Sequence, residues 1–463
     1  MMEKSNVFQP VSEKKSYEKS IFYKVSCALI FIMIFINVTF PKAGIKLGGI
    51  PLTVGNVFLM LTIMMWFFYV LWRRCFVFST AEKLVILGCV YWLIRFMLTM
   101  IGGRVGMSGW VGFFVPLVIY PFTFIVINYF IVEQRQIDKI IRMLMWGSVV
   151  VFIFGFLQAA FGIERFSIPG LTVNYTDYIS STNWYAEKYN GVQEGVTYSK
   201  TVSTYQNGNL LGVNILLFCP MIYESIENKA WRNIYMLVFV LFCILTGSKT
   251  CWVGIIIYLF IKGVVVINRK WADGRKVQFA CLVIAVIPVM AAIFLGMFPQ
   301  IMERFKDSFT FKNINDLSGR SQSMNELINY FIVKTEWILT GPYGLTSYWG
   351  SSYEMVYFCI LMIGGVAGLI AFLGPVLYIL VKYIGRHVRD SKVLKGICHG
   401  VVVYIIIAFV EGALWLPPTA INLWMVLALG YKMSLFMEEK ENENRNRCQT
   451  AQKTESRDRN LCV

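Results

Sequence analysis

The stretch YSKTVSTYQNGN, residues 198–209, brings together a cation, hydroxyl groups and amides where a polar segment meets an apolar one. Lys200 supplies the cation and Tyr205 an aromatic ring, and Asn207 and Asn209 stand where a helix is expected to begin. The first N–H groups of a helix have no carbonyl partner within it, so this position suits an anion or a sugar hydroxyl group. Capping of the helix by the asparagines alone is the alternative interpretation.

The elements that must position this stretch are those of an all-α polytopic membrane protein. The chain has 463 residues, of which 57% are hydrophobic and 15% charged, and this composition is typical of membrane proteins. Apolar runs of roughly 20 residues, the length that spans a hydrocarbon core, recur along the chain, and we expect about 12 transmembrane helices. The runs lie near 21–40, 53–72, 84–101, 111–132, 144–161, 210–225, 234–246, 252–266, 277–298, 356–380, 397–414 and 420–436. The seventh and eighth runs are short and could form one hairpin around GSKT.

Lysine and arginine fall mainly in the segments that share a side with the N-terminus, which predicts that both termini are cytoplasmic. The net charge of +16 is then a mark of topology and of contact with anionic lipids, and we do not expect nucleic-acid binding. Residues 1–20 are expected to be an uncleaved cytoplasmic segment. Residues 437–463 form a charged cytoplasmic tail that we expect to be disordered.

The chain has 11 cysteines and two histidines, but no CxxC motif and no histidine cluster. Most of the cysteines fall in the predicted spans, the inner loops or the tail, both histidines lie toward the inner face, and neither long outer segment contains a cysteine. The sequence therefore predicts no zinc-type metal site and no cofactor.

Two long outer segments divide the predicted spans into the groups 21–161, 207–298 and 354–436. The first segment, 162–206, is rich in Tyr, Ser, Thr and Asn, and it is either a surface that stacks on and hydrogen-bonds to sugars or an ordinary loop packed on itself. The second, 299–353, contains SGRSQSMNELINYFIVKTEW. Its apolar residues recur at helical spacing, which predicts an amphipathic helix at the outer membrane surface.

Two ionisable side chains lie inside predicted spans near their outer ends, Arg95 and Glu411. Because a charge at such depth is costly, each is a candidate functional residue. An Arg95 side chain that reaches out to the membrane surface is the alternative. The polar chemistry gathers at the outer face, whereas a transporter is expected to carry it near the midplane.

Three local patterns, in this order, resemble the O-antigen polymerase and ligase superfamily, glycosyltransferases that act on undecaprenyl-pyrophosphate-linked sugars. The first is KTVSTYQNGN, similar to a family element in which a basic residue precedes a small residue, an aromatic ring and an Asn-containing turn. The second is Ser248–Lys249, at an outer turn between two spans. The third runs from Gly319–Arg320 through GPYG to SSYEMVYFCILMIGGVAGLIAF, similar to the family's closing pattern with its spaced glycines, which we expect to allow close helix packing.

The chain departs from the family's ligases at three places. Ligases carry Arg at the first two positions and His near the third, where this chain has Lys200, Lys249 and Glu354. Lysine offers phosphate a point charge in place of the planar fork of arginine. The missing histidine favours a polymerase over a ligase.

The resemblance implies a GT-C-like membrane glycosyltransferase whose active site faces the periplasm. Lys200, Lys249 and Arg320 would surround the departing pyrophosphate and replace a divalent metal, because cations fixed where charge develops stabilise the transition state. Glu354 is the candidate catalytic base, and the alternative is that it forms a structural salt bridge to one of the basic residues. Glu411 is the second candidate for the base. Tyr205, Asn207, Asn209 and Arg95 complete the predicted substrate-binding set.

The expected function is repeat-unit polymerisation of a cell-surface polysaccharide, such as lipopolysaccharide or capsule, at the bacterial inner membrane. The partners implied are a lipid-linked donor and acceptor, membrane lipids, a chain-length regulator and a flippase. The alternatives are a ligase of the same family and, from a different class, a polysaccharide-lipid flippase or other transporter.

Overall fold

The computed structural model describes residues 20–47, 50–73, 78–101, 107–163, 165–180, 190–193, 196–199, 201–269, 329, 338–341, 355–412 and 418–459. Its helices are α2 (Ile21–Thr39), α3 (Val54–Arg73), α4 (Thr80–Ile101), α5 (Met107–Phe114), α6 (Phe122–Phe130), α7 (Gln134–Phe161), α8 (Tyr175–Ser180), α10 (Gly208–Ser225), α11 (Lys229–Leu245), α12 (Lys249–Arg269), α17 (Val356–Ile379), α18 (Lys392–Ile407) and α19 (Thr419–Arg459). Shorter helical turns are η1 (Val115–Ile119), η4 (Leu380–Ile384) and η5 (Gly385–His387). The antiparallel hairpins are β1 (Gly44–Leu47) with β2 (Ile50–Thr53), and β3 (Asn190–Gln193) with β4 (Val196–Ser199). The all-α prediction is confirmed.

Seven helical stretches among these residues are long and apolar enough to cross a membrane. They are Ile21–Thr39, Val54–Trp72, Thr80–Met100, Val111–Phe130, Gln134–Phe161, Val356–His387 and Thr419–Asn446. Large apolar side chains stay exposed on the outside of the bundle, among them Leu87 of α4 at 65%, Ile256 of α12 at 62% and Ile370 of α17 at 64%. A water-soluble surface rarely carries so much apolar area, so the chain is a multi-pass membrane protein.

The predicted runs other than 277–298 overlap described helices, with shifted boundaries. The run 144–161 is the second half of α7, which begins at Gln134 with a capping box formed by Glu133 and Gln136. The run 111–132 is interrupted: α5 passes into the π-helical turn η1, and α6 follows Pro121. Proline has no N–H group and cannot continue the helical hydrogen-bond ladder. The run 277–298 and most of the predicted amphipathic helix lie outside the described residues.

The short runs 234–246 and 252–266 belong to two antiparallel helices, α11 and α12, which together make one helical hairpin. α11 ends at Leu245 and α12 begins at Lys249. The turn between them contains Gly247, whose φ of 62° is one that glycine adopts without strain. GSKT is therefore the tip of the hairpin.

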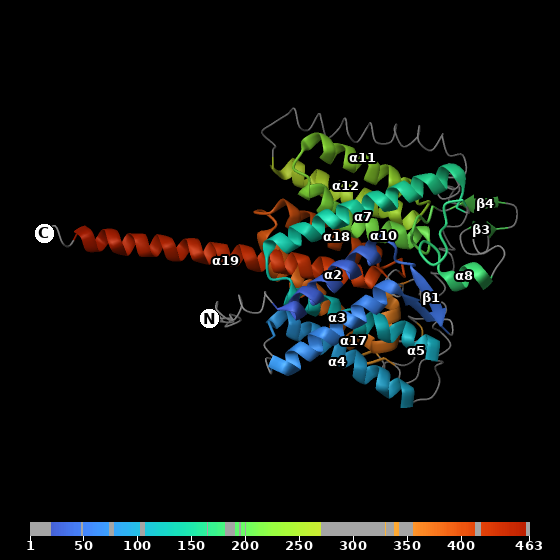
Figure 1. Ribbon diagram of the computed structural model, residues 1–463, viewed down its shortest axis with the longest axis horizontal. Coiled ribbons are helices and arrows are strands. Elements are labelled where there is room, and N and C mark those ends of the chain that lie inside the picture. The colour runs from blue at the N-terminus through green and yellow to red at the C-terminus, as the bar shows by residue number, and fades with distance from the viewer. Residues whose placement is uncertain are drawn as a thin grey trace.

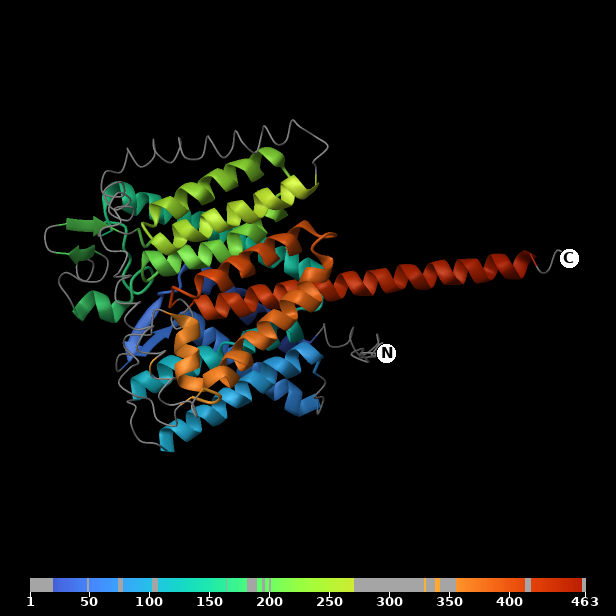
Figure 2. The same cartoon turned by 180° about the vertical axis from the view of Figure 1, so that it is seen from behind.

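The bundle has two distinct ends (Figures 1 and 2). The two β-hairpins and α8 lie at one end, named here the loop end (Figure 1). The start of α2 and the protruding part of α19 lie at the opposite end, named the tail end (Figure 1). The beginning of the first described helix and the end of the last one therefore lie on the same side of the bundle. That this side faces the cytoplasm stays a prediction.

The prediction of a disordered tail is wrong for the described residues, because α19 continues to Arg459 (Figure 2). Its first part is buried in the bundle, and its polar part leaves the bundle as a single helix. Extending a helix that is already anchored avoids the cost of nucleation, and Glu, Lys, Arg and Gln favour helix. Glu441 and Arg445, at 3.9 Å, form an ion pair between successive turns.

Helix α17 is broken at Gly365, whose φ of 60° and ψ of −162° are not helical. Residues 338–341 lie against the break: the N–H of Val366 donates to Ile338 O at 2.8 Å and the N–H of Ala367 to Leu339 O at 2.9 Å. A second segment far away in sequence thus replaces hydrogen bonds that the helix has lost.

The prediction that the glycines of GGVAG allow close packing is confirmed. A Cβ atom added at Gly364 would lie 2.5 Å from the Trp92 ring of α4, and one at Gly368 would lie 2.9 Å from it. At Gly365 an added Cβ would lie 2.5 Å from the Leu339 carbonyl. The glycines therefore serve helix packing and the break in α17.

We predict that Gly365→Ala destabilises the protein. The φ/ψ pair of Gly365 belongs to a region that is essentially restricted to glycine, so the strain should cost about 1–3 kcal/mol before the contact with Leu339 is counted. The measurement is the temperature at which half of the detergent-purified protein aggregates. Gly374→Ala in the same helix is the control, since its new Cβ would meet only Ile370, at 3.9 Å, and alanine favours helix. Equal midpoints for the two variants would contradict the role assigned to the break.

Candidate functional site

The helices α10 and α12 begin side by side at the loop end. The Asn207 side chain caps α10 by accepting from the N–H of Leu210 at 2.8 Å. Ser248 caps α12 by accepting from the N–H of Cys251 at 3.3 Å. A Cβ atom added at Gly212 would lie 2.5 Å from Cβ of Cys251, so the first turns of the two helices touch. The positive ends of two helix dipoles therefore meet at one place.

Opposite charges stand at this place. Lys249 is exposed at the first position of α12. Next to it, the Thr250 hydroxyl group donates to Oε2 of Glu411 at 3.0 Å, and Glu411 is only 7% exposed. Asn207, Asn209, Lys249, Thr250 and Glu411 are named here the loop-end cluster. The structure thus brings Glu411, predicted from its depth in a span, to the helix that Lys249 begins.

A buried network of amides continues inward from the loop-end cluster. The Asn214 amide of α10 donates to Leu210 O and to Oγ1 of Thr419, both at 2.8 Å, and the Asn422 amide donates to Oδ1 of Asn214 at 2.7 Å. These contacts bring the start of α19 to the same end as the starts of α10 and α12. Sequence reasoning missed Asn214, Thr419, Asn422 and Thr250, although single polar residues within apolar runs are a signal that could have found the asparagines.

Tyr205 is buried in the bundle and is not accessible from the surface. Its side chain is fully buried, and its hydroxyl group donates to Val38 O of α2 at 2.8 Å. The neighbouring Ser203 has a φ of 52° and donates to Val151 O of α7 at 2.6 Å, while Gln158 donates to Ser203 O at 2.9 Å. The turn that leads into α10 is therefore fixed to α2 and α7, and this turn sets where the loop-end cluster stands.

Arg95 lies inside the bundle and does not extend outward to the membrane surface. It is 4% exposed, and its Nε donates to Ile363 O at 2.8 Å. Tyr91, one turn earlier on α4, donates to Gly364 O at 2.6 Å. Both side chains thus satisfy carbonyl groups at the break in α17, which gives Arg95 a structural function.

Arg95 and the loop-end cluster are linked through α17. The N–H of Val356, the first residue of α17, donates to Ala408 O at 3.3 Å, just before Glu411. Ile363, which accepts from Arg95, lies about 10 Å further along the helix by its rise per residue. Lys200, Arg320 and Glu354 lie outside the described residues, so their convergence with Lys249 stays a prediction.

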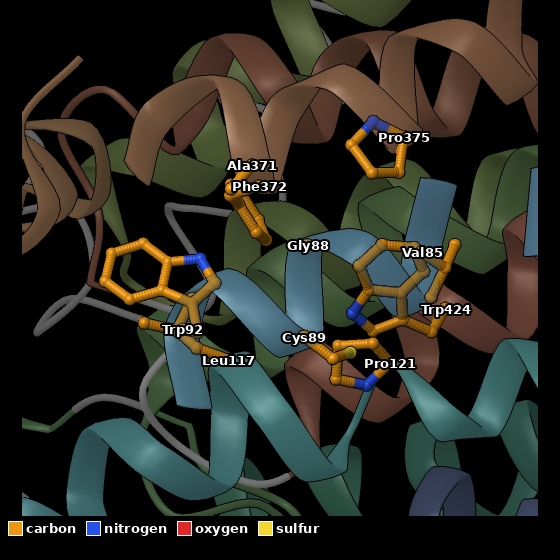
Figure 3. Close-up of a pocket in the computed structure, with 10 residues that line it drawn as sticks. All are labelled: Val85, Gly88, Cys89, Trp92, Leu117, Pro121, Ala371, Phe372, Pro375 and Trp424. Atoms are coloured by element: carbon orange, nitrogen blue, oxygen red, sulfur yellow. The ribbon is translucent and has the colours of Figure 1, made fainter. Parts of the chain in front are cut away.

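A small cavity lies elsewhere in the bundle, among α4, η1, α17 and α19 (Figure 3). Its walls include Trp92, Pro121, Pro375 and Trp424, and the rest of its lining is apolar as well, apart from the Cys89 thiol. Without a charged group it has nothing to hold a phosphate or to move a proton. The loop-end cluster is therefore the better candidate site among the described residues.

Comparison with known proteins finds no match for the chain, whether among family models, curated proteins or solved structures. The loop-end cluster is therefore interpreted from its own chemistry. An exposed ammonium group and two helix N-termini suit an anion, and a buried carboxylate can accept a proton.

We predict that Thr250→Val lowers the stability of the protein by about 1.5–3 kcal/mol, the scale for one hydrogen bond to a charged group. Valine keeps the branched shape and removes the hydroxyl group that Glu411 accepts from. The measurement is the thermal midpoint of the detergent-purified protein. Thr80→Val, at the exposed start of α4, serves as the control. A Thr250→Val midpoint as high as that of this control would show that the contact with Glu411 contributes nothing.

Proposed function

We propose that this protein is a glycosyltransferase that polymerises polysaccharide repeat units carried on undecaprenyl pyrophosphate. The observation that carries the proposal is the loop-end cluster, in which Lys249 heads α12 beside the start of α10 and beside buried Glu411. The resemblance of KTVSTYQNGN, Ser248–Lys249 and the glycine-rich start of α17 to O-antigen polymerases supports it. The substrate would enter from the membrane with its pyrophosphate at the loop end.

The leaving group of this reaction is a pyrophosphate, and the cluster has the groups to receive it. As the bond between the anomeric carbon and the pyrophosphate oxygen breaks, its electron pair moves onto that oxygen. Lys249 and the first N–H groups of α10 and α12 would stabilise this charge. Lys200 and Arg320 are proposed to add two more cations.

The nucleophile is a hydroxyl group of the terminal sugar on the incoming lipid-linked unit. Its oxygen forms the new bond to the anomeric carbon, and its proton passes to a carboxylate. Glu354 is the proposed base, with Glu411 in reserve. Because Thr250 already donates to one oxygen of Glu411 at 3.0 Å, that carboxylate is held in a fixed position.

The proposed location is the bacterial cytoplasmic membrane, with the loop end outside and both termini inside. The start of α2 and the extension of α19 lie together at the tail end (Figure 1), which supports this orientation. A chain-length regulator and a flippase are the proposed protein partners.

The function is tested by the lipid-linked products of a strain that lacks the gene. Because a polymerase joins repeat units, we expect single repeats on undecaprenyl pyrophosphate to accumulate outside the membrane and long chains to disappear. Mass spectrometry of extracted lipids and accessibility of the sugars to an external glycosidase are the measurements. Long chains left on the lipid would identify a ligase instead, and single repeats confined to the inner leaflet would identify a flippase.

We predict that Lys249→Ala lowers polymerisation by a factor on the order of 10²–10³, the scale for losing one preorganised electrostatic group. Lys249→Arg should retain more activity because a cation remains. Lys200→Ala and Arg320→Ala should behave as Lys249→Ala does, and Glu354→Gln tests the base by removing only its charge. The measurement is the chain-length distribution of the surface polysaccharide, normalised to the amount of protein in the membrane.

The matched control is Lys46→Ala, which removes a cation from β1 at the same end of the molecule but outside the loop-end cluster. This variant should make polymer of normal length. Normal polymer from all three alanine variants would eliminate the proposed pyrophosphate site, whereas normal polymer from Glu354→Gln would eliminate only the base.

A further inference from the structure

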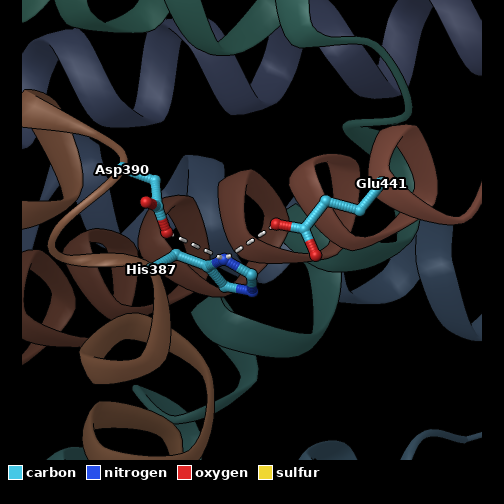
Figure 4. Close-up of side chains that lie close together, drawn as sticks. All are labelled: His387, Asp390 and Glu441. Atoms are coloured by element: carbon cyan, nitrogen blue, oxygen red, sulfur yellow. Dashed lines mark ion pairs between the residues drawn. The ribbon is translucent and has the colours of Figure 1, made fainter. Parts of the chain in front are cut away.

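A buried histidine stands among carboxylates at the tail end of the bundle, far from the loop-end cluster. His387 closes the turn η5 after α17 and is 2% exposed. Asp390 lies in the turn before α18, and Glu438 and Glu441 lie on α19. Figure 4 shows His387 between Asp390 and Glu441, which approach its ring from two different elements.

The two ring nitrogens of His387 face different carboxylates. Nδ1 is 3.9 Å from an oxygen of Asp390 and 3.9 Å from an oxygen of Glu441. Nε2 is 3.5 Å from Oε1 of Glu438, which also accepts from Arg386 at 3.1 Å. The candidate ligand atoms of His387, Asp390 and Glu441 all lie within 4.8 Å of one another.

This arrangement matches the way proteins orient a metal-binding histidine. Such a histidine directs its second ring N–H group to a carboxylate, which fixes the tautomer and leaves the other nitrogen for the metal. Glu438, held by Arg386, faces Nε2 at 3.5 Å without forming a hydrogen bond to it, and a rotation of its side chain would bring it within reach of the Nε2 proton. The Nδ1 lone pair then faces two carboxylates, and three negative or electron-rich atoms repel one another unless a cation stands between them.

The spacing also points to a shared ion. A hydrogen bond between an imidazole nitrogen and a carboxylate oxygen would need about 2.9 Å, well below the 3.9 Å seen for both oxygens near Nδ1. Zinc holds nitrogen and oxygen ligands at about 2.0–2.2 Å in a tetrahedron, which places neighbouring ligand atoms about 3.4 Å apart. Rotation of the half-exposed Asp390 and Glu441 side chains can close the remaining gap.

We propose that His387, Asp390 and Glu441 bind one divalent transition-metal ion of the Zn²⁺ type. Nδ1 of His387 and one oxygen from each carboxylate are the protein ligands, and water completes the shell. An imidazole with two carboxylates suits zinc better than Mg²⁺ or Ca²⁺, which prefer oxygen ligands only. The ion would fasten α19 to the turn between α17 and α18 where α19 leaves the bundle, and it takes no part in chemistry at the loop end.

The sequence alone does not indicate this site, because its ligands come from distant parts of the chain and meet only in the folded protein. His387 and Asp390 are close in sequence, but Glu441 comes from a different helix beyond α18. The prediction of no zinc-type site rested on the lack of a CxxC motif or a histidine cluster. A single histidine with two carboxylates has no such local pattern.

The test is the binding of Zn²⁺ to the full chain in detergent, purified through a tag without histidine. After dialysis against micromolar Zn²⁺, elemental analysis should find one more zinc per chain in the wild type than in His387→Gln. X-ray absorption at the zinc edge should show nitrogen and oxygen neighbours. Zinc with sulfur neighbours only, or equal zinc in both proteins, would place the metal on the cysteine thiols and overturn the proposal.

Asp390→Asn keeps the proposal testable if the buried His387→Gln protein does not fold, because Asp390 is 57% exposed. It should weaken Zn²⁺ at least about tenfold, the scale on which even outer-shell partners act. The matched control is Glu443→Gln, which removes the same charge from an exposed position of α19 and should leave binding unchanged. If Asp390→Asn binds Zn²⁺ as tightly as the wild type does, the metal proposal is wrong.

Discussion

Every backbone N–H and C=O group within a bilayer must find its partner inside the protein, and this constraint governs the break in α17. Gly365 interrupts the helix, and the freed groups are taken up by two segments: residues 338–341 accept from the N–H groups of Val366 and Ala367, while Tyr91 and Arg95 of α4 donate to the carbonyl groups. The break is therefore a point at which a long loop segment, α4 and α17 are joined. Arg95, which the sequence predicts as a substrate ligand, donates its Nε hydrogen to a backbone carbonyl group here, and its role toward a substrate stays a prediction.

The loop-end cluster is also positioned by side chains that hydrogen-bond to backbone carbonyl groups. Tyr205 and Ser203 donate to backbone carbonyls of α2 and α7, so the turn before α10 is fixed by hydrogen bonds and not by its own sequence alone. α10 and α12 can touch because Gly212 has no side chain where Cys251 stands. The buried carboxylate of Glu411 is then oriented by Thr250. Such support from neighbouring residues is what a preorganised anion site requires, because its groups must be in place before the charge develops.

Features that depend on local pattern could be predicted well from the sequence. Apolar runs within the described residues identified most of the long helices, the glycines of GGVAG identified close packing, and an Asn-containing turn identified the start of α10. Each of these features depends on residues near one another in the chain. The sequence did not predict features that depend on contacts between residues far apart in the chain. Nothing near Arg95 indicates that its partner is Ile363 O. Polarity alone favours disorder for the charged tail after residue 437, whereas the anchored helix before it and its helix-favouring residues let α19 continue.

The two ends of the molecule differ in how they hold charge, and this difference bears on where chemistry can occur. At the loop end, exposed Lys249 begins α12, whose first turn touches that of α10, and the neighbouring Thr250 binds buried Glu411. A cation next to two helix N-termini suits an anion. At the tail end three carboxylates surround one imidazole, with Arg386 and Arg445 paired to two of them. Together these contacts join α19 to the turn between α17 and α18. An anionic substrate is favoured by an exposed cation at the start of a helix, and among the described clusters this arrangement is found at the loop end.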